Sequence, residues 1–373
     1  MSWMIEEIDN RGGEVPFDVF MELALYHPEH GYYSHEEPRY GRDGDFLTAP
    51  TASEWYTGVL SRLLVAVAAT SGPIRFIDVA SGDGAVIAGI LEPLGGTASD
   101  VLSEVISVER SASMLDRQKS ILRSTPASIR WCGQVHWIDP SPTPTVVHAS
   151  ELYDALPVAR LVGGRGGPEE LVVAVSRGEL AWKRRPPRDE VADYVTGHEI
   201  ELEEGQIAEV NLGAESLHAA VLSVVGGCGL SLVLDYGYET RRLYDPRGRR
   251  GGSLTTFSRH QLGHDPLASP GEVDLTAHVN WADLRRAADS AGWREVGLWS
   301  LAEFLVRAGI AVELEERGLG MEAALDAATV TARQEVKRLL DPEGMGSDLK
   351  VLVQAKGEMK EVAQAILELP NAN

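Results

Sequence analysis

The sequence predicts an α/β fold in which a Rossmann-like parallel sheet carries helices on both faces. From about residue 75 onward, short apolar segments alternate with segments whose apolar residues recur at helical spacing. This alternation is typical of a parallel sheet, because each strand is reached through a crossover helix that covers one face. A glycine-rich turn at residues 80–84 follows the first apolar segment, as it does in many nucleotide-binding α/β folds.

The strands are predicted from segments that are short, apolar and rich in β-branched residues. They are residues 75–80, 105–109, 135–138, 145–150, 230–236, 294–299 and 349–355. Helices are expected between the early strands, at residues 85–94 and 113–123. The last two strands would complete one edge of the sheet.

Regions outside this alternation indicate how the chain is divided. Helical spacing at residues 15–26 and 54–69 predicts an N-terminal helical segment. Strand-like segments at 171–175 and 180–183 flank a turn and predict an inserted β-hairpin. A long polar loop at 239–275 is of a kind that is usually functional. The expected divisions are the N-terminal segment 1–72, a first part of the core 73–159, the insertion 160–211, and a second part of the core 212–373.

The composition limits the partners of the chain. Its 373 residues carry a formal net charge of -22, and so acidic a surface argues against nucleic acid or an anionic membrane as partner. The longest apolar stretch, residues 219–234, is too short to span a bilayer, and the N-terminus shows no signal peptide. Cys132 and Cys228 are far apart, so we expect a reducing, cytoplasmic compartment. A homodimer is left open.

Residues around the glycine-rich turn are the first candidates for ligand binding. Asp78 ends the first strand, and Ala80, Gly82 and Gly84 follow in the turn. Glycines let the backbone approach a ligand closely, and the N-terminus of the next helix favours an anionic group. Glu109, at the end of the second strand, is placed to accept the hydroxyls of a ribose. The strand order also fits a dehydrogenase, but the spacing is not G-x-G-x-x-G, and Asp78 suits an ammonium better than a pyrophosphate. A tight turn without ligand is the plainer alternative.

Two carboxylates follow the fourth predicted strand, which ends at Ser150. They belong to Glu151 and Asp154. Because ligands of open α/β sheets lie beyond the carboxyl ends of the strands, both residues are candidates for ligand binding. A helical turn would place both on one side, where they could hold a guanidinium or an amine, or accept a proton. Alternatively, Asp154 caps the next helix and Glu151 is solvated.

Several separated motifs follow one another in a characteristic order between about residues 15 and 356. They are residues 27–33, 44–50 with Ser53, 78–84, 151–157, 235–237, 252–255 with His260, and 270–281. In this combination they resemble the MidA-like family of class I S-adenosylmethionine-dependent methyltransferases. That family includes a mitochondrial complex I assembly factor that methylates an arginine.

The resemblance implies a fold, a cofactor and a set of site residues. The fold would be a seven-stranded methyltransferase sheet, with an N-terminal segment whose loop closes over the cofactor and an inserted subdomain that shapes the substrate cleft. The cofactor would be S-adenosylmethionine, with Glu151 and Asp154 near the transferred methyl group. The residues implied to bind or border the cofactor are Gly44, Asp45, Thr48, Asp78, Ala80, Gly82, Gly84, Glu109 and Ser150.

The sequence departs from the family pattern at the expected cofactor site. Asp78 and Ala80 replace the usual Glu and the first Gly of the turn, and Ser150 replaces the usual Asn of the fourth motif. Ala80 costs little if its φ is negative, but its methyl group could crowd the cofactor. Because these changes lie at the cofactor and substrate end, the identity of the methyl acceptor does not follow from the resemblance.

Three functions stay open for the chain: methylation of a protein side chain, with arginine favoured, methylation of a small molecule, and a non-catalytic assembly factor that retains the fold. Methyl transfer mainly requires that donor and acceptor be aligned. Glu151 and Asp154 would orient a guanidinium, whereas His260 or His278 is a candidate base for a hydroxyl acceptor, although a lone His is more often structural. No His, Cys and carboxylate cluster has metal-ligand spacing.

Overall fold

The structure is a computed structural model, and it describes residues 2–34, 53–125, 127–258, 261–263, 265–320 and 326–368. The chain forms two compact units, each assembled from three segments. The first unit comprises Met1–Leu47, Tyr153–Leu217 and Tyr236–Leu284, and the second comprises Thr48–Leu152, His218–Asp235 and Arg285–Asn373. The N-terminal segment expected at 1–72 is divided between the two units, and the insertion expected at 160–211 belongs to the first unit together with residues 1–47.

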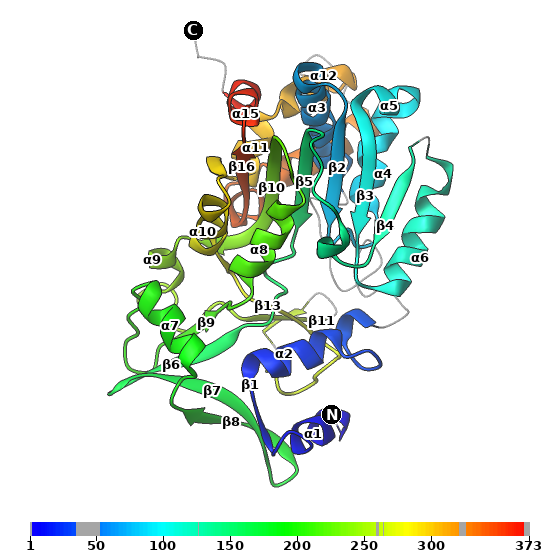
Figure 1. The fold of residues 1–373 in the computed structure, drawn as a ribbon. Coiled ribbons are helices and arrows are strands. Elements are labelled where there is room, and N and C mark those ends of the chain that lie inside the picture. The colour runs from blue at the N-terminus through cyan, green and yellow to red at the C-terminus, as the bar shows by residue number, and fades with distance from the viewer. Residues whose placement is uncertain are drawn as a thin grey trace. The chain divides into compact units, whose positions relative to one another are not determined.

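The second unit is built on a sheet of strands that alternate with helices along the chain (Figure 1). Its strands are β2 (Ile74–Val79), β3 (Leu102–Val108), β4 (Ile129–Cys132), β5 (Thr145–Ser150), β10 (Gly229–Tyr238), β15 (Arg294–Ser300) and β16 (Leu349–Lys356). They lie in the order β15-β16-β10-β5-β2-β3-β4. Neighbours from β10 to β4 are parallel, whereas β15 is antiparallel to β16. The α/β prediction is thereby confirmed. One further strand, β14 (Val279–Asn280), pairs with the far end of β10, so the described sheet counts eight strands.

One predicted strand was wrong. Residues 135–138 do not pair with the sheet, and Val135–Trp137 form a single turn of 3₁₀ helix. The strand at this edge is β4, which pairs with β3 from Ile129 to Cys132. None of its residues is fully buried, so the apolar pattern that identifies the inner strands is missing there.

Helices flank this sheet (Figure 1). α3 (Glu54–Ser71) contacts β2 and α4 (Ala85–Leu94), and α15 (Met359–Leu367) contacts β16. The Ser53 hydroxyl caps α3 by accepting a hydrogen bond from the Trp55 amide. The other helices that lie wholly or partly in this unit are α5 (Ala98–Val101), α6 (Ala112–Ile121), α8 (Ala214–Ser223), α10 (Trp281–Ser290), α11 (Leu301–Arg307), α12 (Ile310–Glu316), α13 (Ala327–Leu339) and α14 (Met345–Asp348). Within the described residues, no helix combines the length and apolar character needed to cross a bilayer.

The first unit contains an antiparallel sheet and a smaller one. The antiparallel sheet contains β1 (Glu14–Pro16), β6 (Ala159–Gly164), β7 (Gly167–Ser176), β8 (Glu179–Arg185) and β9 (Ile207–Val210). The hairpin predicted within residues 160–211 is present as β7 and β8. The insertion is larger than that hairpin, however, because β6, β9 and α7 (Asp189–Gly197) also belong to it. Part of the expected loop 239–275 is ordered as α9 (Thr240–Leu243), β11 (Thr255–Ser258), β12 (Gln261–Leu262) and β13 (Asp274–Thr276).

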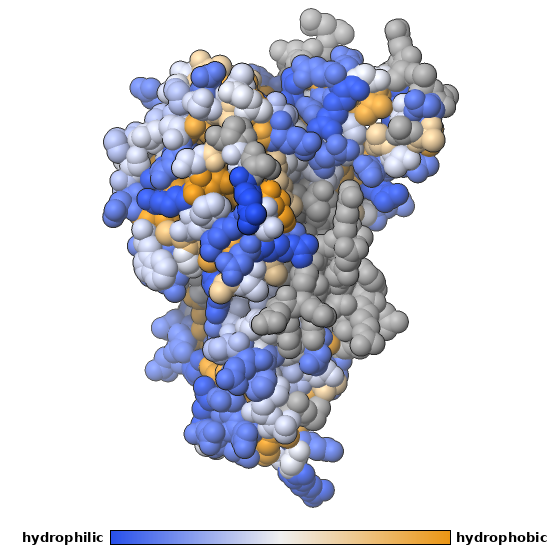
Figure 2. Space-filling view, turned by 90° about the vertical axis from the view of Figure 1, so that its right-hand side faces the viewer, coloured by the Kyte–Doolittle hydropathy of each residue, from blue (hydrophilic) through white to orange (hydrophobic). Residues whose placement is uncertain are grey.

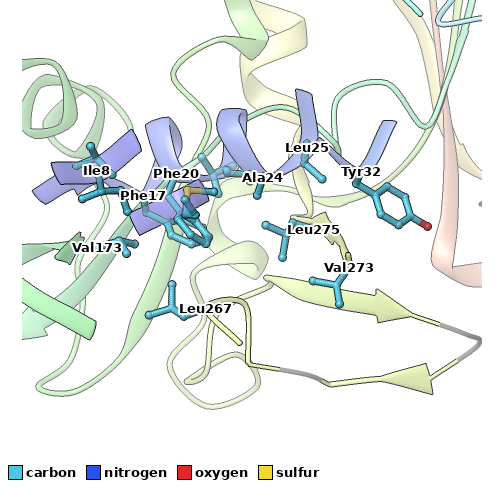
Figure 3. Packing of buried hydrophobic residues seen from close by; sticks show 14 of the residues in the cluster. Ile8, Phe17, Phe20, Ala24, Leu25, Tyr32, Val173, Leu267, Val273 and Leu275 are labelled. Atoms are coloured by element: carbon cyan, nitrogen blue, oxygen red, sulfur yellow. The ribbon is translucent and has the colours of Figure 1, made fainter. Parts of the chain in front are cut away.

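The hydrophobic core of the first unit forms around α2 (Phe17–Tyr26). Figure 3 shows Phe17 and Phe20 beside Ile8 and Val173 at one end of the cluster, with Tyr32 and Val273 at the other end. Ile8 lies on α1 (Ser2–Asp9), a helix that the sequence analysis did not predict. This core fixes α1 and α2 on the antiparallel sheet through β1 and β7. On the molecular face drawn in Figure 2, hydrophilic residues predominate and apolar ones are confined to small areas, as the composition leads one to expect.

Candidate cofactor site

The turn after β2 has the backbone conformation of a ligand-binding loop. Ala80, Gly82 and Gly84 all have positive φ, at 58°, 54° and 85°. Gly84 is the N-cap of α4, so the free amides of that helix begin at the turn. Glycine adopts this conformation without steric cost, whereas Ala80 does so at a cost. The condition under which Ala80 would cost little, a negative φ, is therefore not met.

Asp78 lies at the end of β2 with only 2% of its surface exposed. Its Oδ1 accepts a hydrogen bond from His148 Nδ1, at 2.7 Å. Its Oδ2 is buried and has no hydrogen-bond partner among the described residues. A buried carboxylate oxygen without a partner is costly, unless a ligand supplies a donor.

Glu109 faces the same turn from the end of β3. Its Oε2 accepts from the Gly82 amide at 3.0 Å, and its Oε1 accepts from the Ser111 amide at 2.8 Å. Burial raises the pKa of Glu109 above its ordinary value, while these amide hydrogen bonds lower it. Each carboxylate oxygen can accept a second hydrogen bond, so the group can still accept hydroxyls from a ligand.

A network of buried polar side chains supports the turn, and the sequence analysis did not predict it. Gln118 on α6 donates from Nε2 to the carbonyl oxygen of Gly82, at 2.8 Å. The Ser107 hydroxyl on β3 donates to Gln118 Oε1 at 2.5 Å. Ser81 within the turn donates from Oγ to the carbonyl of Asp78, at 2.8 Å. The turn is therefore fixed by side chains from two neighbouring elements.

Ser150 and Glu151 end the neighbouring strand, β5. The Ser150 hydroxyl oxygen is buried, with no hydrogen-bond partner among the described residues. Glu151 has a φ of 48°, and its amide donates to the carbonyl of Leu234 at 2.8 Å. The helical turn expected to align Glu151 with Asp154 is absent, because the left-handed conformation at Glu151 prevents a helix from starting there.

Four of the predicted site residues lie outside the residues that the structure describes. They are Gly44, Asp45, Thr48 and His260. In the second unit, the structure brings together Asp78, the turn at 80–84 and Glu109. Ser150 follows His148 by two residues on the adjacent strand.

Comparison with known proteins shows to which family this chain belongs. Residues 59–298 match one family of S-adenosyl-L-methionine-dependent methyltransferases. The chain belongs to this family. A structure from Burkholderia thailandensis, solved with bound S-adenosyl-homocysteine, is 29% identical, has a TM-score of 0.83, and is matched over 95% of this chain and 91% of that one.

Two curated relatives carry a more specific name. The protein arginine methyltransferase NDUFAF7 homolog of Drosophila melanogaster is 24% identical over 92% of this chain and 82% of its own length. The protein arginine methyltransferase NDUFAF7 of Rattus norvegicus is 26% identical over 90% of this chain and 79% of its own length. Both relatives are named as mitochondrial proteins.

The residues present in the methyltransferase fit its cofactor, S-adenosylmethionine. When bound, this cofactor supplies a methyl group activated on a sulfonium, so alignment with the acceptor is the main requirement on the protein. The unpartnered Asp78 Oδ2 suits an ammonium donor, and Glu109 suits hydroxyl donors. The positive φ values of the turn would let the cofactor approach the backbone closely. Over the described parts of the chain, no group of three His, Cys, Asp or Glu residues is arranged to hold a metal ion.

In the first unit, Asp154 belongs to a buried polar cluster. It is 5% exposed, and its carbonyl accepts from the Ala277 amide at 2.8 Å. Nearby, the Tyr33 hydroxyl donates to Asp274 Oδ1 at 2.9 Å. Burial raises the pKa of Tyr33 well above its ordinary value, and the charges of Asp274 and Asp154 raise it further. Tyr33 therefore stays a neutral donor to the Asp274 carboxylate.

His278, also in the first unit, is hydrogen-bonded to the guanidinium of Arg249. Arg249 Nη1 lies 2.8 Å from His278 Nδ1, which must accept this hydrogen bond because a guanidinium only donates. Burial and Arg249 together lower the pKa of His278 to about 4. The ring is therefore neutral at pH 7 and a weak proton acceptor, so its assignment as a general base stays a prediction.

Proposed function

We propose that the methyltransferase transfers the methyl group of S-adenosylmethionine to the guanidinium of an arginine in a partner protein. The curated relatives support this proposal, because they are named protein arginine methyltransferases. Their similarity extends over 92% and 90% of this chain. A carboxylate at the end of β5 supports it as well, since Glu151 suits a guanidinium by charge and can accept its hydrogen bonds. The net charge of -22 favours a basic partner segment.

The proposed reaction makes modest demands on the protein. The guanidinium nitrogen must be held in line with the activated methyl group, and a carboxylate that fixes the planar group from one side achieves this. The proton is lost readily once the nitrogen is alkylated, so a strong base is not required before transfer.

Isotope labelling tests the proposal directly. The full-length protein is incubated with S-adenosylmethionine carrying a trideuterated methyl group and with an extract of the source organism, and the labelled products are mapped by mass spectrometry. We expect the label on an arginine side chain of a protein. Label confined to small molecules would favour the small-molecule alternative. Cofactor binding without any label would favour the assembly-factor alternative.

Two variants control this experiment. Glu109→Ala is expected to lose label together with cofactor binding, since it removes the acceptor for the ribose hydroxyls. Glu151→Gln is expected to lose label while it keeps cofactor affinity, because the carboxylate is proposed to act on the acceptor. Normal labelling by Glu151→Gln would remove Glu151 from the acceptor site.

We further propose that the protein works in the cytoplasm. Cys132 and Cys228 are both free thiols in the structure, which suits a reducing compartment. Fractionation of source cells, followed by detection of the protein in each fraction, tests this assignment. Recovery in an organelle, as the names of the curated relatives indicate for those proteins, would overturn it.

A further inference from the structure

Three buried side chains of the second unit form a continuous chain of hydrogen bonds. Asp78 on β2 and His148 on β5 are direct partners in the parallel register, so their side chains leave the sheet on the same side. His148 Nδ1 lies 2.7 Å from Asp78 Oδ1, and His148 Nε2 lies 2.9 Å from the hydroxyl of Tyr56 on α3. None of the three side chains belongs to a residue more than 2% exposed.

The partners of His148 define the proton positions along this series of hydrogen bonds. The Asp78 carboxylate can only accept, so the proton of the imidazole is on Nδ1. Burial, together with the charge of Asp78, raises the pKa of Tyr56 above its ordinary value, so the phenol keeps its proton. Tyr56 can then donate to His148 Nε2, so that both ring nitrogens have a hydrogen-bond partner.

The hydrogen bond from His148 has a specific consequence for Asp78. It engages Oδ1 and fixes the orientation of the carboxyl group. The second oxygen, Oδ2, is buried and has no hydrogen-bond partner among the described residues. The result is an oriented, buried carboxylate with one acceptor oxygen open, next to the turn at the candidate cofactor site. This arrangement suits a cationic donor from the ligand.

We propose that His148 and Tyr56 are positioning residues, which hold the Asp78 carboxylate so that its Oδ2 receives the ammonium of the cofactor's methionine moiety. Neither residue touches the cofactor in this proposal. Tyr56 holds His148, and His148 holds Asp78. The predicted effect is therefore confined to the amino-acid end of the cofactor, and the nucleoside end is unaffected.

Calorimetric titration with two ligands tests whether the effect is limited to the amino-acid end of the cofactor. S-Adenosylhomocysteine contains the ammonium, whereas 5′-methylthioadenosine keeps the nucleoside and lacks the amino-acid part. We expect His148→Leu to weaken binding of S-adenosylhomocysteine by about tenfold or more, since a hydrogen bond to a charged group is lost. Binding of methylthioadenosine should change by less than about twofold, because its contacts do not involve Asp78.

Three further variants separate positioning from a general structural role. His148→Asn keeps a side-chain N–H near the place of Nδ1, so it should restore most of the affinity for S-adenosylhomocysteine. Tyr56→Phe removes a single hydroxyl and should weaken the same ligand selectively, which keeps the test decisive if His148→Leu does not fold. Glu109→Ala is the matched control, since it should weaken both ligands. Equal loss of both ligands in Tyr56→Phe and His148→Leu, or no loss of either, would overturn the proposal.

Discussion

His218 Nε2 lies 2.7 Å from Gln354 Oε1, in a fully enclosed contact between α8 and β16. The two residues are 0% and 1% exposed. Burial lowers the pKa of His218 from 6.5 to about 4, although the hydrogen bond to Gln354 opposes this shift. The folded second unit therefore contains a neutral imidazole here at pH 7, with Nε2 as the donor to the amide oxygen.

This contact predicts an acid sensitivity of folding. Because the pKa of His218 is lower in the folded state, its stabilising contribution is present above about pH 6.5 and is lost as the pH falls toward 4. The loss amounts to at most about 3 kcal/mol of the free energy of unfolding. Urea unfolding at pH 7 and pH 5 should show a smaller pH dependence for His218→Gln than for the natural protein. His136, which is exposed, provides the control, since His136→Gln should leave the pH dependence unchanged.

The backbone strain at Ala80 predicts that glycine at this position would stabilise the folded protein. The φ of 58° at Ala80 lies in the left-handed region, which costs a residue with a Cβ about 1 kcal/mol. Ala80→Gly should therefore raise the free energy of unfolding by up to about 0.5 kcal/mol, after allowance for the greater freedom of glycine in the unfolded chain. Ala88→Gly, within α4, should have the opposite effect, because its backbone is helical. Destabilisation by both substitutions would contradict the assignment of strain to Ala80.

The parts of the site that the sequence predicted are local to strand ends. Asp78 lies near the end of a buried strand, and the turn at 80–84 and Glu109 directly follow such strands; in an open α/β sheet this position alone indicates a ligand. The inner strands were predictable for a similar reason, because burial on both faces leaves a continuous apolar segment. The edge strand β4 was not, since its side chains are only partly covered.

The remaining site residues depend on contacts between distant parts of the chain. His148 is 70 residues from Asp78, and only the pairing of β2 with β5 brings them together. Gln118 is 36 residues from Gly82 and lies in the middle of a helix, where glutamine carries no signal of its own. A single His within an apolar strand is read as a core residue, because nothing local marks its partner.

Glu109 predicts a ligand-specific loss of affinity. If its carboxylate accepts the ribose hydroxyls, Glu109→Ala should weaken S-adenosylhomocysteine about ten- to one-hundred-fold, as expected for hydrogen bonds to a charged group. The 2′-deoxy analogue of the same ligand should lose much less, since it already lacks one of the hydroxyls. Calorimetry with the two ligands measures this difference. A loss of the same size for both would place the hydroxyls elsewhere and leave Glu109 to support the turn through Gly82 and Ser111.

Gln118 predicts a loss that does not depend on the amino-acid part of the ligand. Gln118→Ala removes the donor to the Gly82 carbonyl and the acceptor for Ser107, and it leaves these buried groups unsatisfied. The free energy of unfolding should fall by about 1 to 3 kcal/mol. Because the whole turn loses its support, S-adenosylhomocysteine and methylthioadenosine should weaken together, unlike the result expected for His148.

Gln118→Glu sharpens this prediction. Its carboxylate still accepts from Ser107 but cannot donate to the Gly82 carbonyl, so two acceptors would face each other in a buried place. It should therefore bind both ligands no better than Gln118→Ala, despite its closer match in size. The exposed Gln134 serves as the control, since Gln134→Ala should alter neither folding nor binding. Natural affinity in Gln118→Glu would show that side-chain volume at this position, rather than the hydrogen bond to Gly82, supports the turn.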